Sequence, residues 1–212
     1  MSRKIDPTTW PRKQVFDFFS GVSNPFYMVT FRLDVTKLKD YTKQRDISFY
    51  YALVYLCTKC VNKVEAFHYA IRDGEVFYLE ERNPSFTDMK KDSELFHIVT
   101  MDCEGSLDEF CREARERSMA QDCFIQAEKE TDELIYFSCL PWLDMTAMTN
   151  ERDLNAPTAK DVAIPTIAWG KYVETDGKFE LGMSIEVNHR LIDGYHIGQF
   201  AQELEKSIDM LY

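Results

Sequence analysis

The segment Asn188–Gly194, near the C-terminal end of the chain, holds the residues best suited to chemistry. His189 stands four residues before Asp193, which is followed directly by a glycine. The imidazole of histidine has an unperturbed pKa of about 6.5, so it can act as a general base near neutral pH. A carboxylate close to such a base commonly fixes the geometry of a site. The spacing therefore predicts a site built around His189.

The residues before this segment place His189 at the end of a predicted β-strand. Phe179–Val187 alternates apolar and polar residues, which is typical of a strand with one buried face. A histidine at a strand end can also be a core residue satisfied by hydrogen bonds. The Asp193-Gly194 turn beside it favours the catalytic interpretation. His196, on the helix expected to close the chain, is expected to have a surface or packing role.

The remaining chain alternates segments with helical and with strand periodicity. No linker divides it, and we expect a single domain over residues 1–212, of the α+β class, with one mixed β-sheet covered by helices. Ser48 and Ser106 are expected to begin helices as N-caps, and Asp73-Gly74 and Asp176-Gly177 to form hairpin turns. Helices are predicted over 10–19, 37–43, 49–63, 107–126 and 195–211, and strands over 26–35, 69–79 as a hairpin, 85–87, 96–101, 134–139, 164–173 and 178–187.

Composition excludes several classes of protein. The 212 residues are 45% hydrophobic, which is too apolar for a disordered chain, and the net charge of −11 argues against binding to nucleic acid or to an anionic membrane surface. No segment approaches the roughly 20 apolar residues of a membrane helix, and the polar N-terminus does not resemble a signal peptide. We expect a cytoplasmic protein.

The cysteines do not form a recognisable metal or redox site. Cys57 and Cys60 have the C-x-x-C spacing of such sites, but they fall inside the predicted helix 49–63. No second cysteine pair completes a zinc site, so buried structural thiols are expected. The chain also lacks a glycine-rich phosphate loop and a G-x-S-x-G nucleophile elbow.

Several short motifs resemble the chloramphenicol acetyltransferase family of coenzyme A-dependent acyltransferases. His-x-x-x-Asp-Gly at 189–194 is the signature of that superfamily, and W-x-R-x-x-x-F-x-x-F at 10–19 resembles the opening of the family. Further matches follow in the same order at 31–39, 49–50, 70–75, 86–87, 138–142 and 170–172. The resemblance covers essentially the whole chain. It implies a two-layer sandwich with a mixed sheet covered by helices.

The resemblance also implies an activity and an assembly. The chain would transfer an acetyl group from acetyl-CoA, as co-substrate, to a hydroxyl of chloramphenicol or a similar small acceptor, which is the chemistry of antibiotic resistance. It would form a homotrimer with active sites between neighbouring subunits. No metal and no permanently bound cofactor are expected, because a thioester is already activated towards attack by an alcohol.

The roles of individual residues are likewise implied by the resemblance. His189 would be the general base, and Ser138 would donate a hydrogen bond to the oxyanion of the tetrahedral intermediate. Asp193 would pair with Arg12 and hold the loop of the histidine, with Asn188 as a further structural support. The acceptor would contact Phe18, Phe19, Tyr27, Thr87 and Phe96, and coenzyme A would lie beside Tyr50 and Tyr172.

The chain departs from the family pattern at three places. Asn188 stands where the family has the first of two histidines, and Ala168 where it usually has a threonine. The segment 144–158 matches poorly, with a polar residue near Asn150 in place of an aliphatic one. Two alternatives stay open: a dihydrolipoamide acyltransferase-like catalytic domain, and a non-catalytic relic that binds coenzyme A or a small ligand.

Overall fold

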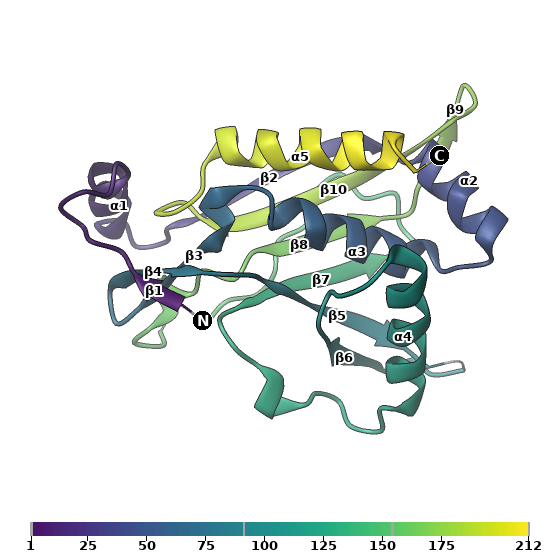
Figure 1. Cartoon of the computed structure of the whole chain (residues 1–212), viewed down its shortest axis with the longest axis horizontal. Coiled ribbons are helices and arrows are strands. Elements are labelled where there is room, and N and C mark those ends of the chain that lie inside the picture. Colours follow the sequence, from purple (N-terminus) through teal and green to yellow (C-terminus); the bar gives the residue numbers. More distant parts are fainter. Residues whose placement is uncertain (1, 91, 154, 212) are drawn as a thin grey trace.

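The fold is seen in a computed structural model of the chain, which describes residues 2–90, 92–153 and 155–211. Its largest element is a mixed sheet in which β7 runs parallel to β5 and to β8 while the other pairs are antiparallel (Figure 1). The predicted mixed sheet and α+β class are confirmed. The strand order is β2 (Phe26–Asp34), β10 (Lys178–Asn188), β8 (Thr166–Gly170), β7 (Leu134–Leu140), β5 (Asn83–Met89) and β6 (Phe96–Thr100), with the short β9 (Val173–Thr175) paired to β10.

A second, three-stranded sheet was not expected from the sequence. It has the order β1 (Ser2–Lys4), β4 (Glu75–Leu79) and β3 (Tyr69–Arg72), with β3 and β4 forming the predicted hairpin. The prediction of one sheet was therefore wrong. The hairpin pairs with the N-terminal residues instead of extending the main sheet. It is also held by an ion pair, in which two guanidinium nitrogens of Arg72 bind the carboxylate of Asp132 at 2.6 and 2.8 Å.

The residues that the structure describes form five α-helices beside the sheets, and two of them start at the predicted caps. Ser48 accepts a hydrogen bond from the amide of Tyr51 at the start of α3, and Ser106 and Glu109 form a reciprocal capping box at the start of α4. The helices are α1 (Lys13–Ser20), α2 (Thr36–Arg45), α3 (Phe49–Val61), α4 (Leu107–Ala120) and α5 (Gly194–Asp209), and three short 3₁₀ turns lie at Glu65–His68, Ala127–Lys129 and Ala159–Asp161.

Two predicted helix boundaries were wrong. Helix α1 begins at Lys13 rather than at Trp10, because the indole of Trp10 is buried against Phe16 and Tyr69. Helix α4 ends at Ala120 rather than at 126. Beyond it the chain turns extended and binds the edge of the main sheet, since the carbonyl oxygen of Phe124 accepts a hydrogen bond from the amide of Ile98.

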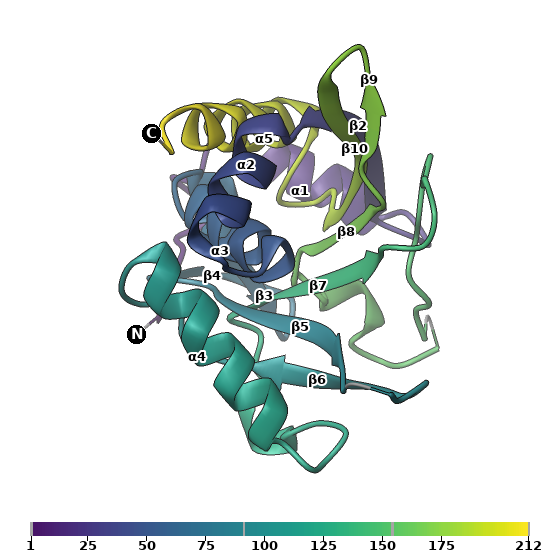
Figure 2. The same cartoon turned by 90° about the vertical axis from the view of Figure 1, so that its right-hand side faces the viewer.

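The helices α2 to α5 lie on one face of the main sheet (Figure 2). Along β10, Ile185 and Val187 belong to the core on that helical face, so the alternate residues Ser184 and Glu186 point to the other face. We call this second face the open face. Part of it is covered by the chain after β7: a methyl group added to Gly182 would come within 2.2 Å of the carbonyl oxygen of Met145.

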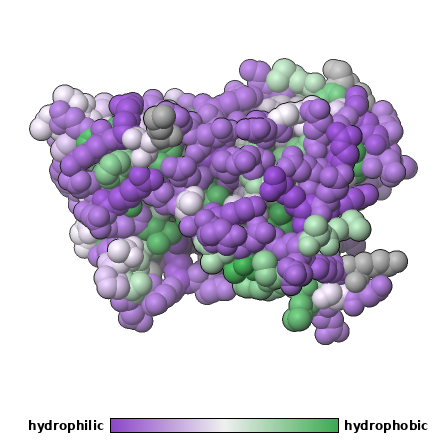
Figure 3. Space-filling view, turned by 60° about the horizontal axis from the view of Figure 1, so that its bottom comes forward, coloured by the Kyte–Doolittle hydropathy of each residue, from purple (hydrophilic) through white to green (hydrophobic). Residues whose placement is uncertain are grey.

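The outer surface is mainly hydrophilic, with small hydrophobic patches on the side shown in Figure 3. Acidic residues outnumber basic ones by 36 to 25, which makes the surface acidic. Among the described residues, no helix combines the length and apolarity needed to cross a membrane.

Candidate active site

His189 follows directly after the last residue of β10 and is held between two aromatic rings. Its ring stacks on Phe19 at 4.0 Å and on Tyr27 at 4.4 Å between centroids, with interplanar angles of 26° and 13°. Its amide donates to the carbonyl oxygen of Pro25 at 2.7 Å. Neither ring nitrogen hydrogen-bonds to another residue in the described ranges. The stacking therefore fixes the plane of the imidazole and leaves its nitrogens available.

Arg12 joins the start of α1 to the loop that follows His189. Its guanidinium donates to three acceptors: the carbonyl oxygens of His189 and Arg190, each at 3.0 Å, and the carboxylate of Asp193 at 2.8 Å. The Arg12 side chain is only 14% exposed. A single planar group thus binds both ends of the 189–193 loop, because its five N–H donors point in fixed directions.

Asp193 also begins α5. Its carboxylate accepts from the amide of Tyr195 at 3.1 Å, and the ring of His196 accepts from the amide of Asp193 at 3.2 Å. The two residues form a capping box that satisfies amides left free at the helix start. One carboxylate therefore serves both as the helix cap and as the partner of Arg12.

Burial and charge together favour a neutral imidazole at His189. Burial lowers the pKa of His189 below its usual value, and the nearby guanidinium of Arg12 lowers it further, against an opposing effect of Asp193. Burial alone would raise the pKa of Asp193, but the hydrogen bonds from Arg12 and from the amide of Tyr195, together with the charges of His196 and Arg12, outweigh it, and the pKa is lowered. At neutral pH the site thus combines an ionised carboxylate with an unprotonated base.

Asn188 ties the strand of the histidine to a distant loop. Its side chain is buried, its amide group donates to the carbonyl oxygens of Lys160 and Val162 at 2.8 and 3.0 Å, and its oxygen accepts from the amide of Arg190 at 3.2 Å. Arg190 adds an ion pair of 2.7 Å with Asp161. Sequence reasoning missed Arg190, although an arginine amid the apolar residues of the motif was a signal of a buried, paired charge.

Ser138 does not lie beside His189. It is opposite Ala168 on β8, which is opposite Ser184 on β10. Two strand spacings, about 10 Å, therefore separate Ser138 from Ser184 across the sheet. His189 lies five residues beyond Ser184 in the direction of β10, which adds about 16 Å along the strand. The two Cα atoms are thus roughly 19 Å apart in one chain.

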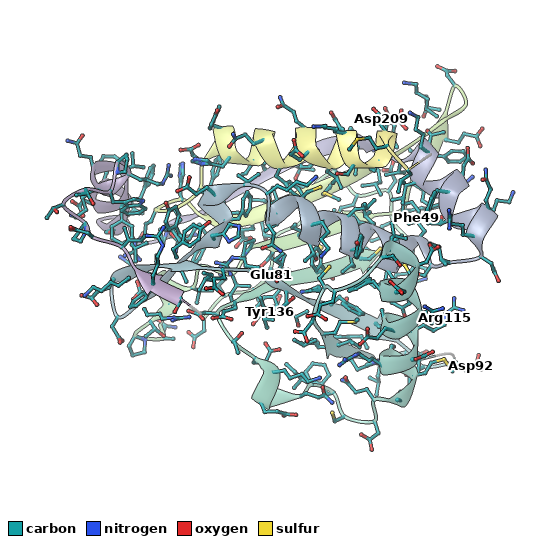
Figure 4. All side chains as sticks on the ribbon, in the orientation of Figure 1. Phe49, Glu81, Asp92, Arg115, Tyr136 and Asp209 are labelled. Atoms are coloured by element: carbon teal, nitrogen blue, oxygen red, sulfur yellow. The ribbon has the colours of Figure 1, made fainter. Side chains whose placement is uncertain are left out.

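Ser138 instead shares its end of the sheet with other predicted site residues. The hydroxyl of Tyr50, on α3, donates to the carbonyl oxygen of Thr87 at 2.6 Å, and its ring lies 5.5 Å from that of Trp169. Burial raises the pKa of Tyr50, so the hydroxyl stays protonated as a donor. Tyr172 lies against Phe49, which Figure 4 labels where α3 begins. This end of the sheet is distant from α1 and His189.

The two remaining predicted contacts are exposed aromatic side chains. Phe18 is 71% exposed and packs edge-on against Phe19, in the group around His189. Phe96, on the edge strand β6, is 50% exposed and contacts Phe124. The predicted residues therefore fall into two groups. A His189 group contains Arg12, Phe18, Phe19, Tyr27, Asn188 and Asp193, and a Ser138 group lies at the other end of the sheet with Tyr50, Thr87, Phe96 and Tyr172.

The described residues contain no group of three or more histidine, cysteine or acidic side chains placed to hold a metal ion. Cys57 and Cys60 are buried free thiols in α3. Burial raises the pKa of both, which makes them poor nucleophiles and poor ligands.

Comparisons with known proteins point to one family. A family model described as chloramphenicol acetyltransferase matches residues 2–205. A protein of that name from Clostridium perfringens is 29% identical over 97% of this chain and 98% of its own length, and one from Campylobacter coli is 29% identical over 95% and 96%.

Solved structures show the same fold. A chloramphenicol acetyltransferase structure matches with a TM-score of 0.87 at 23% identity, covering 97% of this chain and 99% of its own. A dihydrolipoamide acetyltransferase from Azotobacter vinelandii is less similar, with a TM-score of 0.68 at 16% identity, covering 93% and 86%. The fold of this chain is thus more similar to the chloramphenicol acetyltransferase structure than to the dihydrolipoamide acetyltransferase, which represents the alternative enzyme type.

Proposed function

The chain belongs to the chloramphenicol acetyltransferase family, and on this premise we propose that it transfers an acetyl group from acetyl-CoA to a hydroxyl of chloramphenicol or a similar small acceptor. The observation that carries the proposal is the family match over residues 2–205. The whole chain would act as one acyltransferase domain. It would work in the cytoplasm, where acetyl-CoA is made and consumed.

His189 is the general base in the proposed reaction. A nitrogen of its imidazole removes the hydroxyl proton of the acceptor while the hydroxyl oxygen bonds to the carbonyl carbon of the thioester. The carbon–sulfur bond then breaks, and the proton passes from the imidazolium to the departing sulfur, which leaves as the thiol. The lowered pKa of His189 supports this role, because a base must be unprotonated before it acts.

Ser138 is the proposed donor to the oxyanion that forms on the carbonyl oxygen during attack. A donor of this kind typically lowers the barrier by about 3–4 kcal/mol. The donor and the base must reach the same tetrahedral intermediate, so each must lie within hydrogen-bonding distance of it. A separation of roughly 19 Å within one chain does not allow this.

We therefore propose that each site forms between two chains of a homotrimer. The His189 group of one subunit would meet the Ser138 group of its neighbour, and cyclic symmetry would repeat the contact three times. Coenzyme A would lie beside Tyr50 and Tyr172. The acceptor would contact Phe18, Phe19, Tyr27, Thr87 and Phe96, which are divided between the two groups.

Arg12, Asp193 and Asn188 are proposed to support the site without touching the substrates. Arg12 binds the carbonyl oxygen of His189 and the carboxylate of Asp193, and Asn188 joins the amide of Arg190 to the carbonyl oxygen of Lys160. These contacts hold the segment on both sides of His189, which supports this role. Positioning of this kind has a large effect on rate, since a displacement of about 1 Å can cost roughly a hundredfold.

Release of free thiol from acetyl-CoA by the purified protein tests the proposal. We expect release that depends on chloramphenicol or another alcohol and that His189→Ala abolishes while the oligomer stays folded. Full activity in His189→Ala would refute the assignment of His189 as the general base. Binding of coenzyme A without any thiol release would favour the non-catalytic relic.

A further inference from the structure

The helix that carries Phe19 is held to the rest of the molecule by few contacts. Helix α1 has eight residues, all of them described, and Phe16 is the one buried side chain among them. The helix stands apart from the other helices, at the left end of Figure 1. A helix of this length is barely stable alone in water, and one buried side chain gives it little hydrophobic anchoring. Its position therefore depends on what holds its two ends.

The last turn of α1 is held by Arg190, the residue that follows His189 in the sequence. Nε of Arg190 donates to the hydroxyl oxygen of Ser20 at 3.0 Å, and the guanidinium carbon lies 4.3 Å from the centroid of the Phe16 ring. The Ser20 hydroxyl in turn donates to the carbonyl oxygen of Phe16 at 2.7 Å. Arg190 therefore contacts α1 through a hydrogen bond and through the face of a ring.

Arg190 is itself fixed, because its side chain is buried and binds the 3₁₀ turn Ala159–Asp161. Its Nη1 donates to the carbonyl oxygen of Lys160 at 3.0 Å and to the carboxylate of Asp161 at 2.7 Å. The other oxygen of that carboxylate accepts from the amide of Gly74, in the turn of the β3–β4 hairpin, at 3.2 Å. The guanidinium thus joins α1 to a turn that is tied to the second sheet.

Lys160 adds another positive charge at the same end of α1. Its Nζ donates to the carbonyl oxygen of Val22, just beyond the helix, at 2.6 Å. Helix α1 has no basic residue of its own in its last turn, although cations stabilise the negative end of a helix dipole. Arg190 and Lys160 supply these charges from other parts of the chain.

The position of α1 decides where the ring of Phe19 lies. Phe19 is next to Ser20, and its ring stacks on the imidazole of His189 at 4.0 Å. The second ring on the imidazole, that of Tyr27, belongs to β2 and is fixed by the main sheet. Because neither ring nitrogen of His189 hydrogen-bonds to another residue in the described ranges, the two aromatic rings set the plane of the imidazole. One of them is only as well placed as the last turn of α1.

We propose that Arg190 is a positioning residue for the reaction: by holding the last turn of α1, its guanidinium keeps the Phe19 ring against the imidazole of His189. This inference rests on the proposed function. Arg12 and Arg190 then have separate tasks. Arg12 holds the backbone of the base, and Arg190 holds the orientation of its ring through Phe19.

A role limited to stability would not need this geometry. The ion pair with Asp161 already balances the charge of Arg190, and charge balance is what burial requires. The bond to Ser20 needs the planar fork as well, because Nε and Nη1 point in different directions and a single ammonium group cannot reach both acceptors.

The NMR signals of the His189 ring test the inference. A C–H group stacked on an aromatic face is shielded by the ring current, so the Cε1–H signal of His189 should lie upfield in the unaltered full-length protein. With histidine labelled at Cε1 with ¹³C, the chain gives four such signals, and that of His189 is the one missing in His189→Ala. Arg190→Lys keeps a positive charge beside Asp161 but loses the bond to Ser20, and we expect the His189 signal to move downfield.

Thiol release from acetyl-CoA should report the same change. We expect Arg190→Lys to lower kcat about tenfold or more, since a displacement of about 1 Å can cost roughly a hundredfold. KM for acetyl-CoA should not change, because this co-substrate is proposed to lie in the Ser138 group. In a Phe19→Leu background the same replacement should lower kcat by less than about threefold, because the residue through which Arg190 acts is gone.

Two further variants separate positioning from folding. Ser20→Ala removes the acceptor of Nε but leaves the ion pair of Arg190 with Asp161, so it should move the His189 signal in the same direction with little effect on folding. Lys13→Met is the matched control on α1, because the ion pair of Lys13 with Asp17 lies in solvent within the helix. The control should leave both the signal and kcat in place.

A His189 signal that stays in place in Arg190→Lys would overturn the inference, and Ser20→Ala decides in the same way if Arg190→Lys does not fold. A loss of kcat that is equally large with and without Phe19 would also overturn it, because Arg190 would then act by another route. Absence of thiol release with every alcohol would refute the proposed function instead, while the NMR signals would still test the link between Arg190 and the imidazole.

Discussion

Replacing Arg12 by methionine tests how the loop of His189 is held. The change removes three hydrogen bonds, to the carbonyl oxygens of His189 and Arg190 and to the carboxylate of Asp193. Each bond to a charged group contributes about 1.5–3 kcal/mol when it is shielded from water. Water reaches Asp193, whose side chain is 35% exposed, and would replace part of the loss. We expect the free energy of unfolding to fall by about 2–4 kcal/mol.

The same replacement should change the pH dependence of the reaction. The charge of Arg12 lowers the pKa of His189, so its removal raises that pKa. Because the proposed base acts unprotonated, activity falls as the pH drops through the pKa of His189. The acid limb of the kcat/KM profile should therefore move to higher pH in Arg12→Met. The rate at the optimum should also fall, since the loop is less well positioned.

Thermal unfolding at one fixed protein concentration and a pH–rate profile measure the two effects. A loss of about 2–4 kcal/mol corresponds to a lower Tm by roughly 5–15 °C for a chain of this size. Arg45→Met is the matched control, because Arg45 pairs with Asp108 in solvent and should cost less than about 1 kcal/mol. An acid limb that stays in place, or moves to lower pH, would refute the electrostatic reasoning.

Three further replacements test other parts of the account. Ser138→Ala should lower kcat by about 10²–10³ with little change in KM, as measured by thiol release, and an unchanged kcat would remove Ser138 from the site. Gly182→Ala should displace the loop after β7, because its methyl group would lie 2.2 Å from the carbonyl oxygen of Met145, and a cost of about 1–3 kcal/mol is expected in denaturant unfolding. Asn188→Ala removes the side-chain donor to the carbonyl oxygen of Val162 and leaves that of Lys160 with the guanidinium of Arg190, and it should cost about 1–3 kcal/mol in the same assay, whereas an unchanged midpoint would mean that water replaces the amide.

Local features of the fold could be predicted from the sequence, because they depend on neighbouring residues. The alternation along Phe179–Val187 predicted most of β10, and Ser48 and Ser106 predicted the starts of α3 and α4. The end of α4 could not be predicted. The amide of Ile98 on β6 binds the carbonyl oxygen of Phe124, and only the folded chain brings this backbone partner within reach.

Long-range pairing could not be predicted for the same physical reason. Nothing near Ser2–Lys4 in sequence indicates that these residues pair with β4. The ion pair of Arg152 is a comparable case. The sequence shows that its segment is polar, but it does not show that its partner is Glu186, which lies on a strand predicted to have one buried face. Family resemblance supplied the identities of Ser138 and Tyr50, and the register of the sheet supplied the distance between the two groups.

Activity of mixed oligomers tests most directly the central claim, that His189 of one subunit acts with Ser138 of another. His189→Ala and Ser138→Ala chains, each with little or no activity alone, would be refolded together or co-expressed in equal amounts. If each site draws the two residues from different chains, about one site in four receives both native residues under random assembly, so roughly a quarter of native activity should return. If both residues came from the same chain, no site would be restored, and mixed oligomers as inactive as their parents would contradict the account.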